Sequence, residues 1–218
     1  MIGVRLMRLV LMGPPGAGKG TQGARLAQRH GIPRYSTGDI LRAARREGTE
    51  LGRAAQGYMD AGELVPDVVI LGMMRETLSS GEAAAGFLLD GFPRTVAQAE
   101  GLADLMDDLG LELDAVVDLD VPDEEIVRRL SARRVCADCG GVAPSDTEDG
   151  ASCPDCGGEL RRRSDDDPRT LRRRLEVYRD ETAPVLDWYE RSDTRVVRVP
   201  GTGPVEDVHE RVVEAIGA

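Results

Sequence analysis

A glycine-rich loop near the start of the chain limits the folds open to it. The segment Gly13–Thr21 (GPPGAGKGT) follows the apolar run 9–12 and precedes a helical pattern over 19–29, which His30 and Gly31 end. A strand, a glycine loop and a helix in this order are typical of the G-x-x-x-x-G-K phosphate-binding loop. Backbone N–H groups at the helix N-terminus attract an anion, and glycines allow its close approach. The alternative is a glycine-rich turn without a ligand.

Lys19, the charged residue of this loop, is of a type that the rest of the chain does not use. Of the 28 basic residues 27 are arginine, so Lys19 is the one lysine. An ammonium is a compact point charge, whereas a guanidinium is a planar fork, so the exception suits a phosphate contact inside the loop. Gly20 occupies the position where Ser or Thr usually follows the lysine, and Thr21 comes one residue later. Direct coordination of Mg²⁺ by a hydroxyl is therefore less favoured here.

Apolar runs and helical patterns alternate along most of the chain. Buried strands are predicted at 9–12, 86–90, 115–119 and 195–199, and helices at 19–29, 67–79, 96–109, 168–190 and 205–216. This alternation predicts an α/β fold of three layers around a central parallel sheet of about five strands. Pro184 is expected to break or bend the helix over 168–190. Residues 36–65 are predicted to form a helical insert, and 134–164 show no apolar periodicity.

All four cysteines lie in that last segment. Cys136-Ala137-Asp138-Cys139 and Cys153-Pro154-Asp155-Cys156 are thirteen residues apart, and Gly-Gly follows each pair. Paired C-x-x-C knuckles are typical of a tetrahedral Cys₄ zinc site, which is structural because it leaves no open ligand position. Iron could take the place of zinc. The same spacing is also compatible with two disulfides, with free thiols, or with a zinc ribbon that binds nucleic acid.

The charge balance excludes some functions. Acidic residues outnumber basic ones 39 to 28, and aromatics are 3%, which argues against nucleic acid as a partner. No apolar run could span a membrane and no signal peptide is recognised, so a cytoplasmic location is expected. Eleven arginines lie between residues 128 and 174. About half are expected on solvated helix faces, and the others suit bidentate contacts with phosphates.

Several of these motifs together resemble the adenylate kinase family. They are Gly13–Thr21, Tyr35–Arg42, Leu89–Arg94, Arg133–Cys136 and Arg163–Asp166, and the likeness is collinear from about Met7 to the end. The cysteine segment resembles the long zinc-containing lid of bacterial members, and residues 1–6 precede the usual start. The resemblance implies a P-loop core (1–35, 66–131 and 167–218), an AMP-binding insert (36–65) and a zinc lid (132–166). It also implies a monomer that reversibly transfers a phosphoryl group from Mg·ATP to AMP, giving two ADP.

The same resemblance assigns roles to residues. ATP would contact Gly16, Ala17, Gly18, Lys19, Gly20, Thr21, Arg129, Arg133, Val142, Ala143 and Gly203. AMP would contact Thr37, Arg42, Glu63, Leu64, Val65, Gly91, Phe92, Pro93, Arg94, Gln98, Arg163 and Arg174. The catalytic cations would be Lys19, Arg94, Arg133, Arg163 and Arg174. Asp90 would hold Mg²⁺ through water, and Cys136, Cys139, Cys153 and Cys156 would bind the structural zinc.

Two of these assignments have ordinary structural alternatives. Thr37 could be a helix N-cap, and Gln98 could lie on a solvated helix face.

The nearest rival function is a UMP or CMP kinase, although those enzymes usually have a short lid without zinc. A second rival is a P-loop or zinc-ribbon module that binds nucleotide without turnover. A GTPase switch is excluded, because its Asn-Lys-x-Asp motif needs another lysine.

Overall fold

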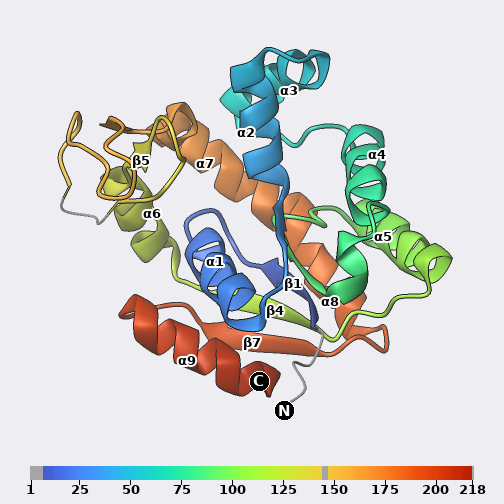
Figure 1. The fold of residues 1–218 in the computed structure, drawn as a ribbon. Coiled ribbons are helices and arrows are strands. Elements are labelled where there is room, and N and C mark those ends of the chain that lie inside the picture. The colour runs from blue at the N-terminus through green and yellow to red at the C-terminus, as the bar shows by residue number, and fades with distance from the viewer. Residues whose placement is uncertain (1–6, 144–146, 218) are drawn as a thin grey trace.

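A parallel β-sheet forms the centre of the molecule (Figure 1). The computed structural model describes residues 7–143 and 147–217, so the ends of the expected core at 1–6 and 218, and 144–146 of the expected lid, lie outside the described residues. The strands follow the order β2-β3-β1-β4-β7 and all pair in parallel. They are β1 (Arg8–Met12), β2 (Arg34–Ser36), β3 (Phe87–Asp90), β4 (Ala115–Asp120) and β7 (Val196–Pro200). The predicted parallel sheet is therefore confirmed.

Helices cover both faces of this sheet, as the alternation predicts. The α-helices are α1 (Lys19–His30), α2 (Thr37–Glu47), α3 (Glu50–Ala61), α4 (Asp67–Leu78), α5 (Val96–Leu109), α6 (Asp123–Ala132), α7 (Pro168–Val177), α8 (Ala183–Glu190) and α9 (Val205–Ile216). Short 3₁₀ turns lie at η1 (Glu82–Ala85) and η2 (Ser164–Asp166). Gly31 ends α1 in the left-handed conformation, as its position in the sequence predicts.

Two apolar cores lie on opposite faces of the sheet. Side chains alternate along a strand, so Val10 and Met12 pack with α4, α5 and α8, whereas Leu9 and Leu11 pack with α1, α6, α7 and α9. Both faces are thus buried, which is why the strands are nearly continuous apolar runs. Among the helices of the described residues, none has the length and apolar character needed to cross a membrane.

The helix predicted over 168–190 is not uniform. The segment η3 (Tyr178–Thr182) is a π-helical turn between α7 and α8, in which the Ala183 N–H donates to the carbonyl of Tyr178. Pro184 lies in the first turn of α8, directly after the π-helical turn. The backbone stays helical through this turn, so the helix predicted over 168–190 is present, and the break or bend expected at Pro184 takes the form of a π-helical turn directly before it.

Two segments extend beyond the sheet. Helices α2 and α3 lie at the top of Figure 1, and the cysteine segment lies at its upper left, beside the end of α7. The cysteine segment contains the short antiparallel strands β5 (Val135–Cys136) and β6 (Leu160–Arg161). Its buried cluster consists of Cys136, Cys153 and Leu160, with Ala143 and Ala151 against it. So small an apolar core cannot by itself hold the segment together, which favours a metal.

Candidate active site

A cavity of about 1580 Å³ lies at the carboxyl ends of β1 and β3. This edge of an open parallel sheet is where ligands bind in α/β proteins. Every nucleotide-binding residue predicted from the sequence lines the cavity, apart from Phe92. Phe92 is 1% exposed, and its ring packs in the core with residues of α4 and α5. Because the ring fills that core, a contact between Phe92 and AMP would have to come from its backbone.

The glycine loop between β1 and α1 contributes one wall. Gly16 and Gly18 have φ angles of +83° and +100°, which only glycine adopts without strain, and a side chain at Gly16 would also strike Leu130. The Lys19 ammonium donates to the carbonyl oxygens of Gly13 and Pro14, at 2.6 and 2.9 Å. Burial, opposed by the negative charge of Asp90 and helped by the positive charges of nearby arginines, lowers the pKa of Lys19 to about 7. A bound anion would restore the charged form.

Arginines from separate elements meet in the same cavity. Arg94 follows β3, Arg163 precedes η2 and Arg174 belongs to α7. Burial, together with the charge of neighbouring arginines, lowers the pKa of Arg94 and of Arg163 to about 10, and lowers that of Arg174. Cations that repel each other in a partly dry cavity form a site for several negative charges.

Carboxylates of η2, at the end of the cysteine segment, pair with some of these cations. Arg133 Nε donates to Asp166 at 2.7 Å, and Asp166 is completely buried. Arg174 donates to Asp165 at 2.8 Å. On the neighbouring face, Arg129 donates to the carbonyl of Gly201 at 2.8 Å. The cations are thus held in position by the protein's own acceptors, with Arg133 and Arg174 both facing the cavity.

Asp90 has a partner that the sequence analysis did not single out. Arg34, the first residue of β2, places its guanidinium 2.7 Å from the Asp90 carboxylate and 2.8 Å from that of Asp39. Asp90 is nearly buried, and Arg34 lines the cavity as well. The two residues are 56 positions apart, and only the pairing of β2 with β3 brings them together.

The opposite end of the cavity is built by α2, α5 and the chain after β3. The Thr37 hydroxyl donates to the carbonyl of Gly91 at 2.8 Å. The N-cap of α2 is Ser36, whose hydroxyl accepts from the Asp39 N–H. The alternative interpretation of Thr37 as the N-cap is therefore wrong, and so is that of Gln98 as solvated, since Gln98 is 2% exposed.

Hydrogen bonds fix both ends of the Gln98 side chain. Its amide oxygen accepts from the Arg94 backbone N–H at 2.8 Å, and its amide nitrogen donates to Asp67 Oδ1 at 2.7 Å. Thr95 is the N-cap of α5 and accepts from the Gln98 N–H, and the Gln98 side chain reaches back past this N-cap to the N–H of Arg94, one residue further than in a capping box. Asp67, the first residue of α4, is a second residue that the sequence analysis missed.

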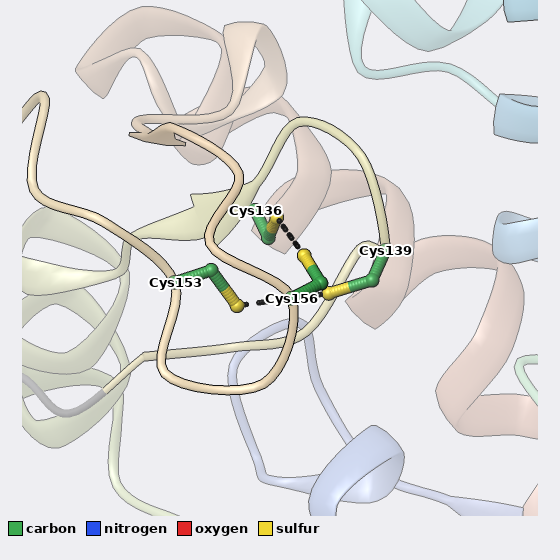
Figure 2. Close-up of side chains that lie close together, drawn as sticks. All are labelled: Cys136, Cys139, Cys153 and Cys156. Atoms are coloured by element: carbon green, nitrogen blue, oxygen red, sulfur yellow. Dashed lines mark hydrogen bonds between the residues drawn. The ribbon is translucent and has the colours of Figure 1, made fainter.

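The four cysteines form one cluster, in which each C-x-x-C pair points its sulfurs toward the other (Figure 2). All four Sγ atoms lie within 4.8 Å of one another. Tetrahedral zinc with Zn–S bonds of about 2.3 Å requires sulfurs about 3.8 Å apart, so the cluster fits that ion. The N–H of Cys136 donates to Gly141 and that of Cys153 to Gly158, at 2.8 and 2.7 Å. The Gly-Gly pairs thus close two matching knuckles.

The parallel sheet, the glycine loop and the cation-lined cavity define a P-loop protein that binds phosphate groups. The sequence profile of the family described as adenylate kinase matches residues 11–194. An adenylate kinase of Streptomyces griseus is 50% identical over 97% of this chain and 98% of its own length. Those of Salinispora tropica (51%; 96% and 98%) and Thermodesulfovibrio yellowstonii (48%; 94% and 97%) are similarly close.

This chain belongs to the adenylate kinase family. It is an enzyme that transfers phosphoryl groups between adenine nucleotides. The four-cysteine cluster fits the zinc-containing, long-lid type within the family.

Proposed function

We propose that the protein catalyses the reversible, Mg²⁺-dependent transfer of a phosphoryl group from ATP to AMP, giving two ADP, and so balances the adenine nucleotides. One observation carries this proposal. A single cavity extends from the glycine loop to a second region around Thr37 and Gln98, and partly buried cations lie along it. Two nucleotides whose phosphates meet among such cations need positioning and charge neutralisation rather than a covalent intermediate.

On the ATP side, the backbone of residues 16–21 would hold the phosphates, and the Lys19 ammonium would follow the transferred group. Arg129 and Arg133 would contact the triphosphate, with Val142, Ala143 and Gly203 near its base. Support comes from the position of these residues in the cavity lining. Because the pKa of Lys19 is about 7 without ligand, phosphate charge would draw a proton onto it.

On the AMP side, Arg42 and Arg94 would hold the phosphate, and Arg163 and Arg174 would neutralise charge during transfer. Thr37, Gln98 and the 63–65 backbone would hold the adenine. The proposed division has a core (1–35, 66–131, 167–218), an AMP-binding insert (36–65) and a lid (132–166). Closure of the lid would exclude water, which would otherwise accept the phosphoryl group. Hydrogen exchange over 135–161 that is the same with and without a bisubstrate analogue would contradict this closure.

Two metals belong to the proposal. Mg²⁺ would arrive with ATP as part of the substrate, and Asp90 would hold it through water; the nearly buried carboxylate on the cavity wall supports this role. Zinc would bind Cys136, Cys139, Cys153 and Cys156 and stabilise the lid in place of an apolar core. The arrangement of the four cysteines as one metal-binding cluster supports a reducing, cytoplasmic location. The protein would work as a monomer on free nucleotides, and the net charge of −11 argues against nucleic acid as its partner.

The test measures ADP formation by the metal-loaded protein with Mg·ATP and each of AMP, GMP, CMP and UMP. Turnover with AMP far above the others is the expected result. A preference for UMP or CMP would keep the phosphate chemistry and overturn the roles of Thr37 and Gln98. Folded, metal-loaded protein without turnover on any of the four would contradict the proposed reaction.

A further inference from the structure

We propose that Asp67 is a positioning residue that determines which purine the monophosphate site accepts, by fixing the orientation of the Gln98 amide. The inference rests on the proposed function, because it takes the region around Gln98 as the adenine site. Gln98 lines the nucleotide cavity, whereas Asp67 lines a separate cavity of about 280 Å³. Asp67 would therefore act on the base through Gln98 and not by touching it.

The amide orientation is fixed from both sides. A backbone N–H can only donate, so the 2.8 Å contact with the Arg94 N–H requires the amide oxygen of Gln98 on that side. An ionised carboxylate can only accept, so the 2.7 Å contact with Asp67 requires the amide nitrogen on the other. A flipped amide would set a donor against the Arg94 N–H and an oxygen against the carboxylate. Both contacts would become repulsive, in a place where Gln98 is 2% exposed and water cannot compensate.

Each contact uses half of what the amide can offer. The nitrogen carries a second hydrogen and the oxygen a second lone pair, so the fixed amide still has one donor and one acceptor for a ligand. Adenine presents an amino group that donates and a ring nitrogen beside it that accepts, which is complementary to this arrangement. Hypoxanthine has the same outline, but its 6-carbonyl accepts and its N1–H donates, so it requires the opposite orientation.

Selection between the two bases thus depends on the contacts that prevent the flip. A site built around hydrogen bonds rejects an analogue that leaves its polar groups unpaired far better than it rejects a change in size. Because Asp67 makes a charge-assisted hydrogen bond, it is expected to contribute about 10- to 100-fold to the preference for AMP over IMP. The remaining preference for AMP would come from the hydrogen bond that the Arg94 N–H donates to Gln98.

The experiment compares kcat/KM for AMP and IMP, at saturating Mg·ATP, in the zinc-loaded full chain. Asp67→Ala removes the acceptor, and Asp67→Asn keeps its shape while allowing either orientation of Gln98. The AMP/IMP ratio is expected to fall by at least about 10-fold in Asp67→Ala and to shift in the same direction in Asp67→Asn, with the KM for Mg·ATP unchanged. Glu76→Gln, which removes an exposed charge from the same helix, should leave the ratio within about twofold of wild type.

The outcomes are separable. If AMP and IMP lose activity by the same factor in both Asp67 variants, Asp67 has only a structural role and the inference is overturned. If Asp67→Ala does not fold, the AMP/IMP ratio of kcat/KM is read from Asp67→Asn instead. An unchanged ratio in that variant would likewise overturn the inference. A wild-type protein that does not turn over AMP would instead contradict the proposed function, before any variant is compared.

Discussion

The contact between α2 and α3 makes a testable demand on one glycine. Gly52 of α3 faces α2 so closely that a Cβ atom there would lie 2.2 Å from the Ala44 carbonyl oxygen and 2.4 Å from the Arg45 nitrogen. Cβ atoms essentially never approach another atom within 3.0 Å, and both neighbours are backbone. The helices would have to separate by about 0.8 Å in the Gly52→Ala variant to relieve the closer contact.

The size of the effect follows from a matched glycine in the same helix. A Cβ at Gly57 would meet nothing within 4 Å, so Gly57→Ala should stabilise the protein by about 0.5–1 kcal/mol through helix propensity alone. Gly52→Ala gains the same propensity term but overpacks a helix contact, at a cost of about 1–3 kcal/mol. The difference between the two variants isolates the packing cost. A packing cost of about 2 kcal/mol corresponds to a Tm difference of about 4–8 °C between the two variants.

The same displacement should affect one substrate more than the other. Helix α2 carries Thr37 and Arg42, whereas the glycine loop belongs to a different part of the fold. A shift of about 1 Å is enough to misplace contacting groups, so the KM for AMP should rise about 10-fold while that for Mg·ATP stays unchanged. Thermal unfolding and initial rates of both variants provide the assay. A Gly52→Ala protein as stable as Gly57→Ala, with normal KM values, would refute the reasoning.

Three further predictions concern charge and metal. Calorimetry in buffers of different ionisation enthalpy should detect uptake of up to about one proton when the triphosphate binds at pH 8 and almost none at pH 5.5. The reason is that Lys19, with a pKa of about 7, is mostly neutral only at the higher pH. No proton uptake at pH 8 would contradict the lowered pKa. Arg34→Gln should destabilise the protein by about 3 kcal/mol in urea unfolding, since it leaves the nearly buried Asp90 without its guanidinium; a loss below about 0.5 kcal/mol would show that the pair is not needed. Chelation of zinc should lower Tm and speed hydrogen exchange over 135–161, with one metal released per chain; Cys139→Ser should do the same, and unchanged exchange would exclude a structural metal.

The layered fold could be predicted because its signals are local. Helix periods and buried apolar runs give α1, α5 and α9 nearly to the residue, and the parallel sheet follows from their alternation. The edge strand β2 has no such signal. It contains only Arg34, Tyr35 and Ser36, of which one is buried, and it becomes a strand by pairing with β3. The π-helical turn before Pro184 is likewise a matter of packing, which no composition rule indicates.

The candidate site likewise has residues that the sequence predicts and residues that it does not. Phosphate-loop, arginine and cysteine motifs occupy short stretches, and the structure gathers their side chains apart from the ring of Phe92. Arg34 and Asp67 were missed because the partners that define them are 56 and 31 residues away. An arginine at a strand edge and an aspartate in the first turn of a helix have ordinary explanations in the sequence. Their importance becomes visible only when strand order and helix packing are known.

The partly buried ammonium of Lys19 gives the chain a built-in chemical reporter. Every other basic side chain except the two histidines is arginine, so a reagent that acylates amines has one side-chain amine to attack, and that amine lies within the glycine loop. A pKa of about 7 leaves much of this amine unprotonated near neutrality, which is the nucleophilic form. A bound triphosphate both covers the amine and keeps it charged. The extent of lysine acylation therefore measures occupancy of the phosphate site directly.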